Sequence, residues 1–259
     1  MPGNDWGHRV ARLHLLGTGA ALSDALRTTT MLAFEGPDDV LVVDCGGDVV
    51  QRLLAHELDL ERVGALVVTH EHADHVSGFP LLMERLWLSG RRHPLPVYGI
   101  APAIAQARRA HDAFDTTRWP DYPGVTYVEV DHAPGATVLE NAQWHVIAAP
   151  GIHSVPAIGI RVVDRRGGGV AAYSGDTSFA PAIVDLARGA DILVHEAGNE
   201  SSMHTLPSQA AQVATEAGVK RLVLVHLPPG FTADGRRADE ARAVFPDVIV
   251  GEDGAVFEF

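Results

Sequence analysis

The heptapeptide THEHADH, residues 69–75, places three histidines and two acidic residues within seven consecutive positions. Protonated histidines in such a cluster repel one another, and the stretch offers little apolar surface to bury. It directly follows the apolar run GALVVT, residues 64–69, which predicts a buried strand. A cation among these side chains would neutralise the acids and accept the imidazole lone pairs. The heptapeptide therefore predicts a metal site at the end of a strand.

The composition is that of a folded globular protein. The chain has 259 residues, of which 46% are hydrophobic and 20% are charged, so it can bury a sizeable core. We expect a single domain over residues 1–259, with residues 1–9 flexible because that segment is polar. The formal net charge of −13 at pH 7 disfavours a broad basic face for non-specific binding of nucleic acid.

Cysteine content and the N-terminal sequence bear on the compartment. The single cysteine, Cys45, cannot form an internal disulfide, which agrees with a reducing environment. The first ten residues, MPGNDWGHRV, lack the apolar core of a signal peptide, and no apolar run is long enough to span a bilayer. We therefore expect a cytoplasmic protein without a membrane partner. The sequence leaves open whether the chain forms a homodimer.

Short apolar runs alternate with helical patterns along the chain, and no linker rich in Gly, Ser or Pro separates two halves. Strands are predicted at 10–17, 30–35, 40–44, 64–69, 94–100, 125–130, 143–149, 157–163, 170–174, 191–196 and 221–227, with a closing strand pair in 248–259. Helices are predicted at 48–58, 77–88, 103–114, 181–187, 207–218 and 238–245. This alternation predicts an α/β fold: an αββα sandwich of two mixed sheets with helices on the outer faces.

Candidate metal ligands follow the ends of the predicted strands. They are His70, His72, Asp74, His75, His153, Asp176 and His226. Strand ends at one edge of a sandwich converge, so these residues can form one site. There are too many of them for one tetrahedral ion, and a carboxylate such as Asp176 can bridge two ions about 3.5–4 Å apart. We expect two divalent transition-metal ions, with zinc favoured and manganese or iron as alternatives.

Several of these motifs together resemble the metallo-β-lactamase fold superfamily. They are HEHADH, the downstream His153, SGDT at 174–177 and His226, and the resemblance extends from LGTGAA at 16–21 to the final strands. The resemblance implies two metal sites that share a bridging Asp176. It assigns His70, His72 and His153 to one metal, and Asp74, His75 and His226 to the other.

Other motifs are similar to those of the tRNase Z-like phosphodiesterase branch. They are DCGG at 44–47, SGDTS at 174–178, HEAG at 195–198 and MHTLPSQAAQVA at 203–214. This resemblance implies that His204 faces the metals and donates a proton to the leaving alkoxide. Glu196 would orient His204 or raise its basicity, and Asp74 would help orient the attacking hydroxide.

The chain departs from the tRNA-processing members of that branch. Those enzymes carry a long arm that grips tRNA between the ligands matching His153 and Asp176, whereas only 22 residues intervene here. His226 is followed by LPPG rather than by a stretch bearing aromatic residues and arginine. Together with the net charge, these departures predict a small-molecule ester substrate and argue against nucleic acid.

These features predict a metal-dependent hydrolase. The favoured interpretation is a phosphodiesterase that cleaves small or cyclic phosphodiesters through a hydroxide bridging two metals. The alternatives are a carboxylic or sulfuric ester hydrolase, such as a lactonase or an arylsulfatase-like enzyme, and a tRNase Z-like ribonuclease. The intact ligand set disfavours a binding module that keeps the fold without catalysis.

Overall fold

The computed structural model describes residues 10–22, 24–198, 203–233 and 235–259. The segment 1–9, for which the sequence predicts flexibility, lies outside the described residues. None of the helices in the described part combines the length and the apolar character that crossing a bilayer requires.

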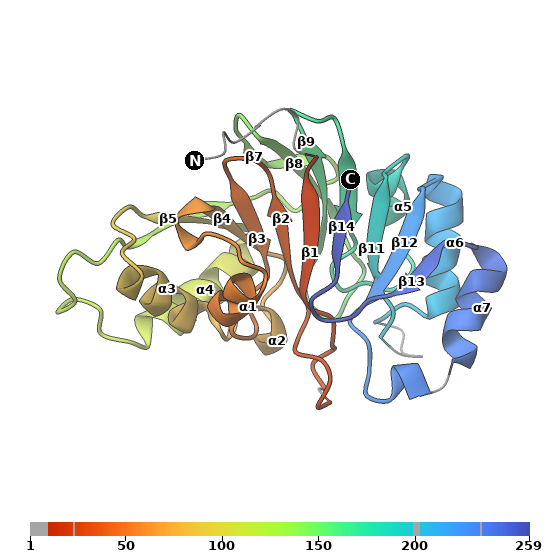
Figure 1. The fold of residues 1–259 in the computed structure, drawn as a ribbon, viewed down its shortest axis with the longest axis horizontal. Helices are drawn as coiled ribbons and strands as arrows, with labels where there is room; N and C mark the ends of the chain where they lie inside the picture. Colours follow the sequence, from red (N-terminus) through yellow and green to blue (C-terminus); the bar gives the residue numbers. More distant parts are fainter. Residues whose placement is uncertain (1–9, 23, 199–202, 234) are drawn as a thin grey trace, which may run out of the picture.

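Two mixed β-sheets lie face to face at the centre of the molecule (Figure 1). The first contains β1 (Arg12–Gly17), β2 (Met31–Glu35), β3 (Val40–Val43), β4 (Val63–Val68), β5 (Leu95–Gly99), β6 (Val125–Glu129) and β14 (Val256–Glu258), in the order β14-β1-β2-β3-β4-β5-β6. The second contains β7 (Ala136–Glu140), β8 (Trp144–Pro150), β9 (Ile158–Asp164), β10 (Val170–Tyr173), β11 (Ile192–Glu196), β12 (Arg221–Val225) and β13 (Val248–Val250), in the order β13-β12-β11-β10-β9-β8-β7.

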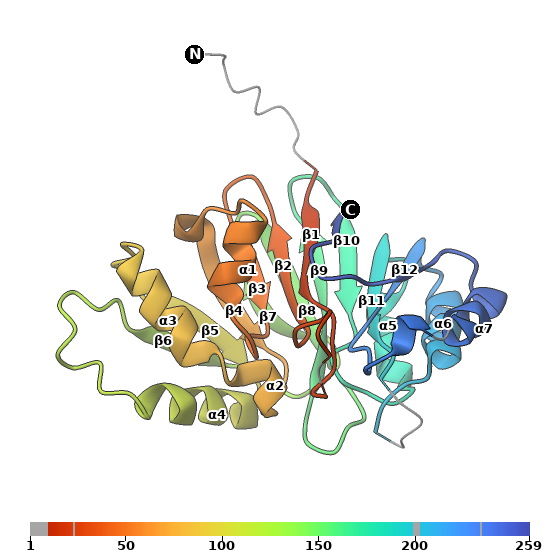
Figure 2. The same cartoon turned by 60° about the horizontal axis from the view of Figure 1, so that its bottom comes forward.

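Helices cover the outer face of each sheet, as Figure 2 shows. On the first sheet lie α1 (Val49–Ala55), α2 (Ala73–Val76), α3 (Phe79–Leu88) and α4 (Ala101–Asp112). On the second lie α5 (Pro181–Ala187), α6 (Pro207–Ala217) and α7 (Arg236–Val244). Short 3₁₀ turns occupy Leu60–Arg62 and Phe231–Ala233. The predicted αββα sandwich is confirmed.

Two apolar cores hold these layers together. The larger core fills the space between the sheets and includes fully buried Phe34, Trp144 and Tyr173. The second core packs the other face of the second sheet against α5, α6 and α7, and it contains alanines of α6 such as Ala210 and Ala214. Removing this apolar surface from water is the main driving force for layering the helices on the sheets.

Strand direction explains why the candidate site residues meet. β10, β11 and β12 are parallel, and β8 runs the same way because both β8 and β10 are antiparallel to β9. Their C-terminal ends therefore lie along one edge of the second sheet. The end of β4 reaches this edge, because the backbone carbonyl of Thr69 accepts a hydrogen bond from the Ile158 amide at 3.2 Å.

The structure differs from the sequence prediction in three elements. β7 was not predicted, and it is a short strand at the edge of its sheet. The helix predicted over 77–88 corresponds to α3, which begins at Phe79, and the short helix α2 before it was not predicted. Gly78 lies between the two helices and packs against the backbone of residues 45–47 so closely that a Cβ would lie 2.1 Å from the Gly47 carbonyl oxygen. The predicted closing strands exist, but they join different sheets, since β13 pairs with β12 and β14 pairs with β1.

Candidate metal centre

The structure brings all seven predicted metal ligands together at the edge where the two sheets meet. His70, His72, Asp74 and His75 follow β4, and the other three ligands follow β8, β10 and β12. In two groups of three, one ligand atom from each residue lies within 4.8 Å of the others: His70, His72 and His153 in one, and Asp74, His75 and His226 in the other. These are the two sets that the resemblance implied, and their role as ligands stays a prediction.

The buried carboxylate of Asp176 lies between the two groups. Its Oδ2 atom is 3.9 Å from His70 Nε2 and 4.0 Å from His153 Nε2 on one side. On the other side it is 3.6 Å from His75 Nε2 and 3.2 Å from His226 Nε2. One carboxylate thus faces an imidazole nitrogen from both groups, which is the arrangement that a bridging ligand requires.

Several polar atoms at the centre of this site lack a hydrogen-bond partner. His75 Nε2, His226 Nε2 and Asp176 Oδ1 are buried and form no hydrogen bond with any residue that the structure describes. Burial lowers the pKa of His70 to about 2, which keeps its imidazole neutral and its lone pair available. Buried polar groups without partners are costly. Divalent cations would satisfy these atoms, so the residues present fit two metal ions.

Asp44 supports the site from behind His75. Its Oδ2 atom accepts a hydrogen bond from His75 Nδ1 at 2.8 Å, and its Oδ1 atom accepts one from the Thr69 amide at 2.8 Å. Burial disfavours the imidazolium form of His75, yet Asp176 and Asp44 on its two sides raise its pKa above the ordinary value. The carboxylate therefore fixes the imidazole and adds negative potential that favours a cation, a common arrangement around metal-binding histidines.

The sequence analysis quoted Asp44 only as part of the motif DCGG and gave it no role. The available signal was an acidic residue at the end of the apolar run VLVV, the same position that the other site residues occupy after their strands. Its partner His75 is 31 positions away in the sequence, so this pairing depends on the fold.

Backbone geometry at the site is unusual at three positions. Asp44 and His226 have φ angles of 61° and 55°, in the left-handed region that residues with a side chain rarely adopt. At Gly46, a Cβ would lie 1.7 Å from the Asp74 carbonyl oxygen. Only glycine at this position lets the loop after β3 pack against the turn that carries Asp74 and His75.

His204 lies beside both ligand groups and is hydrogen-bonded to the buried carboxylate of Glu196. Its Nδ1 atom is 2.9 Å from Glu196 Oε1, and its ring lies 5.1 Å from the His153 ring and 5.2 Å from the His226 ring. The hydrogen bond that His204 Nδ1 donates to Glu196 is the main reason that the pKa of His204 is raised. Glu196 also accepts hydrogen bonds from the amides of Thr177, Gly198 and Thr205, so its position is fixed. Among the described residues, none forms a hydrogen bond with His204 Nε2, so this atom is available to act toward the ligand groups.

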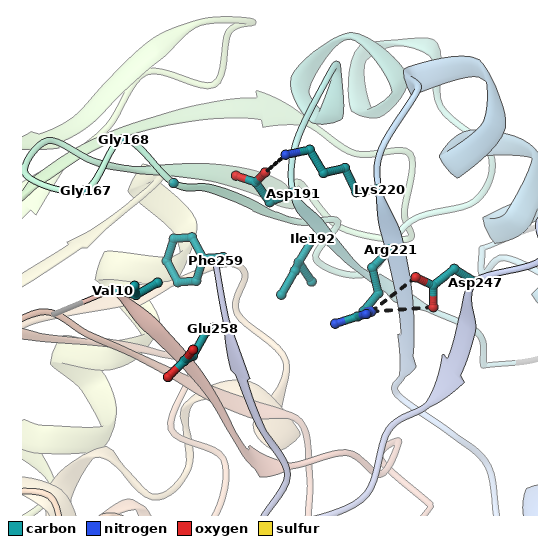
Figure 3. Close-up of a pocket in the computed structure, with 11 residues that line it drawn as sticks. Val10, Gly167, Gly168, Asp191, Ile192, Lys220, Arg221, Asp247, Glu258 and Phe259 are labelled. Atoms are coloured by element: carbon teal, nitrogen blue, oxygen red, sulfur yellow. Dashed lines mark hydrogen bonds and ion pairs between the residues drawn. The ribbon is translucent and has the colours of Figure 1, made fainter. Parts of the chain in front are cut away.

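An open cavity of about 470 Å³ lies at the N-terminal ends of β11 and β12, away from the histidine cluster (Figure 3). Its charged side chains face one another: Lys220 pairs with Asp191 at 2.6 Å, and Arg221 pairs with Asp247 at 3.4 Å. None of its lining residues belongs to the ligand groups. We therefore place the functional site at the histidine cluster.

One wall of that cavity is the turn 165–169 between β9 and β10. Asp164 closes this turn, because its side chain accepts hydrogen bonds from the amides of Arg166 and Gly167 at 2.9 Å each. Residues between His153 and Asp176 thus form β9, a tight turn and β10, and the long arm expected of tRNA-processing relatives is absent there.

Comparison with known proteins agrees with this fold and site. Residues 40–227 match the family described as the beta-lactamase superfamily domain. The chain is 29% identical to the ribonuclease Z of Methanothermobacter thermautotrophicus over 293 positions, covering 92% of this chain and 93% of the relative. That alignment is longer than the 259 residues of the chain, so the relative contains segments that are absent here.

Two solved structures share the fold. The metallo-beta-lactamase fold protein YhfI from Bacillus subtilis has a TM-score of 0.80 at 24% identity, and the match covers 96% of this chain and 100% of YhfI. The short form of human tRNase Z has a TM-score of 0.77 at 22% identity, and the match covers 95% of this chain and 98% of that enzyme.

The fold and the histidine–carboxylate cluster define a metal-dependent hydrolase that uses divalent ions. The chain belongs to the beta-lactamase superfamily and, within it, to the branch that contains ribonuclease Z.

One prediction from the sequence is wrong. The net charge and the missing arm led us to expect a small-molecule ester substrate and to disfavour nucleic acid. The relatives that match over almost the whole chain are ribonucleases, which favours a nucleic acid substrate instead. The physical reason is that net charge sums over the whole surface, whereas phosphate is bound locally, here at a site whose residues fit metal cations.

Replacing the predicted bridging ligand tests the metal centre. We expect close to two transition ions per chain in the wild-type protein. Asp176→Ala should lose both ions or keep one weakly, because both ligand groups face this carboxylate. Metal content after gel filtration measures the effect. Asp185→Ala, at an exposed carboxylate on α5, is the control and should keep full loading. An Asp176→Ala protein that is fully loaded and active would contradict the bridging role.

Replacing the supporting carboxylate tests Asp44 separately. Asp44→Asn should weaken metal binding roughly 10- to 100-fold, the usual effect of altering a partner of a metal-binding histidine. Competition with a chelator of known affinity measures it. Asp164→Asn changes an equally buried carboxylate at the far end of the sheet and should leave metal affinity unchanged. Equal affinities for Asp44→Asn and the wild type would show that Asp44 does not support the site.

Proposed function

We propose that the chain is a metal-dependent ribonuclease of the ribonuclease Z type, which hydrolyses phosphodiester bonds in RNA. The observation that carries this proposal is the pair of ligand groups around Asp176 with His204 beside them, in a chain that aligns almost end to end with a ribonuclease Z. The finer prediction of small or cyclic phosphodiesters has no comparable support among the relatives.

The metal ligands proposed for this reaction are His70, His72 and His153 on one side, Asp74, His75 and His226 on the other, and Asp176 between them. Divalent ions held there supply Lewis-acid chemistry, since they lower the pKa of water and offset negative charge on phosphate oxygens. Asp74 lies at the exposed side of its group, with 12% of its side chain accessible, and would orient the attacking water.

His204 is proposed as the general acid. Its Nδ1 atom is engaged by Glu196, so Nε2 is the nitrogen that can carry a proton to the leaving oxygen. The attacking water releases one proton to solvent, and as its oxygen bonds to phosphorus, the bond from phosphorus to the leaving oxygen breaks. The proton on His204 Nε2 then passes to that oxygen, which departs as a hydroxyl group. Glu196 stabilises the protonated imidazole and acts through His204.

A precursor RNA tests the substrate class. The metal-loaded protein should cut a precursor tRNA endonucleolytically at its 3′ extension, and chelation or Asp176→Ala should abolish the cut. Gel analysis of end-labelled RNA measures it. A lactone and an aryl sulfate serve as control substrates and should be hydrolysed far more slowly. Rapid hydrolysis of either control together with intact RNA would contradict the proposal.

Varying the leaving group tests His204. His204→Ala should keep its metals but lose kcat on RNA by roughly 10²- to 10⁴-fold, the usual contribution of a general acid. Hydrolysis of bis-p-nitrophenyl phosphate should suffer less, because nitrophenolate departs without a proton. His145→Ala, on β8, is the matched control. Equal losses on both substrates would make His204 a binding or structural residue.

A further inference from the structure

A second pocket lies away from the metal centre, between α3, α4 and the loop that follows α4. It has a volume of about 220 Å³, and its walls include Glu84, His111, Phe114, Thr116, Trp119 and Tyr122. Figures 1 and 2 both show this loop projecting at the end of the molecule opposite α6 and α7. α4 begins beside α2, which carries Asp74 and His75, and leads toward the loop.

The aromatic rings of this pocket are held in place from behind. Trp119 stacks on Trp87, with ring centroids 4.7 Å apart and ring planes inclined by 17°. Trp87 Nε1 also donates a hydrogen bond to the Pro120 carbonyl at 2.9 Å. Tyr122 stacks on His111, and its hydroxyl is 2.6 Å from His111 Nε2. These rings are positioned before any ligand arrives, which reduces the entropy lost on binding.

Phe114 also lines the pocket, and 57% of its surface is accessible to solvent. A large aromatic side chain exposed at the rim of an aromatic pocket offers a second face for a flat ligand. Glu84 lines the same pocket and forms no hydrogen bond or ion pair with any residue that the structure describes. The pocket therefore combines aromatic walls with one free carboxylate acceptor.

The exposed arginines between the end of α3 and the loop after α4 differ from the others in forming no ion pairs. Elsewhere in the described chain, exposed cationic side chains form ion pairs with acids: Arg12, Arg165, Arg166, Arg188, Lys220, Arg236 and Arg242. The exposed arginines that form no ion pair with a described acid are Arg92, Arg108, Arg109 and Arg118. All four belong to the region from the end of α3 to the loop after α4. These arginines are not held by ion pairs and can turn toward a ligand, and the exposed acids Asp112, Asp115 and Asp121 lie on the same segment.

We propose that this pocket binds an unpaired base of the RNA substrate while Arg118, the chain neighbour of Trp119, contacts a phosphate of the same strand. The inference rests on the proposed ribonuclease function. Stacking on aromatic side chains and a cationic surface for the backbone are how proteins hold single-stranded nucleic acid. Glu84 favours guanine, whose adjacent N–H donors match a carboxylate, over uracil, whose carbonyl oxygens would face it. The pocket would grip RNA beyond the cut site in a chain that lacks the long arm.

The first experiment separates substrate grip from chemistry. Trp119→Ala should raise KM for RNA about 10-fold, because stacking of one base is typically worth about 1–3 kcal/mol. Its hydrolysis of bis-p-nitrophenyl phosphate, which is too small to span both sites, should stay at the wild-type level. Trp119→Phe should restore most of the RNA affinity. Val256→Ala, an exposed apolar change on β14, is the control. An unchanged KM for RNA in Trp119→Ala would overturn the proposal.

Charge and base preference are tested with variants that leave the rings intact. Arg118→Gln should reduce the slope of log KM against log salt by about 0.7–0.9, the loss expected for one phosphate contact. Arg188→Gln, on the opposite side of the molecule, should leave that slope unchanged. Glu84→Gln should reduce the preference of the protein for a guanine-containing oligonucleotide over oligouridine. Unchanged slope and unchanged preference would both count against the pocket.

A binding assay keeps this inference separate from the proposed function. Metal-stripped protein is titrated with a short guanine-containing RNA while tryptophan fluorescence is recorded. If the wild type binds through Trp119 but cleaves no RNA when loaded with metal, the ribonuclease proposal fails and the pocket stands. If it cleaves RNA and Trp119→Ala performs equally well, the pocket fails and the function stands. If Trp119→Ala instead abolishes self-association, a second copy occupies the pocket and the proposal is overturned.

Discussion

The structure depends on one constraint: the buried carboxylate of Asp176 and the polar atoms around it need cations. Asp176 lies among four imidazole rings, fully surrounded by protein, and several of the facing nitrogen and oxygen atoms have no hydrogen-bond partner among the described residues. Such a cluster is costly to bury unless cations satisfy it. The site therefore has to be understood as a cation-binding centre that the fold holds in place.

The architecture places the ligands for this purpose. Parallel strands deliver Asp176 and His226 to one edge of the second sheet, and the loop after β4 adds the histidines of the heptapeptide. Left-handed backbone at Asp44 and His226 adds local strain that only a well-packed surrounding sustains. The two apolar cores thus stabilise a geometry that the site residues alone would not adopt.

Sequence reasoning predicted much of this because its signals were local. An apolar run followed by THEHADH is visible in seven residues, and the ends of later strands carried the remaining ligands. The contribution of Asp44 depends on a pairing with His75 across two loops, and β7 is a short edge strand with a weak pattern. The substrate prediction was wrong because net charge does not show where charges lie: the arginines without acidic partners become visible only once the fold shows which others are paired.

The central claim is that two metal ions share Asp176. Anomalous X-ray diffraction from crystals of the metal-loaded protein tests it most directly, because it locates each ion independently of any assay. The account predicts two anomalous peaks about 3.5–4 Å apart, one on each side of the Asp176 carboxylate. A single peak, or two peaks of which neither contacts Asp176, would contradict it.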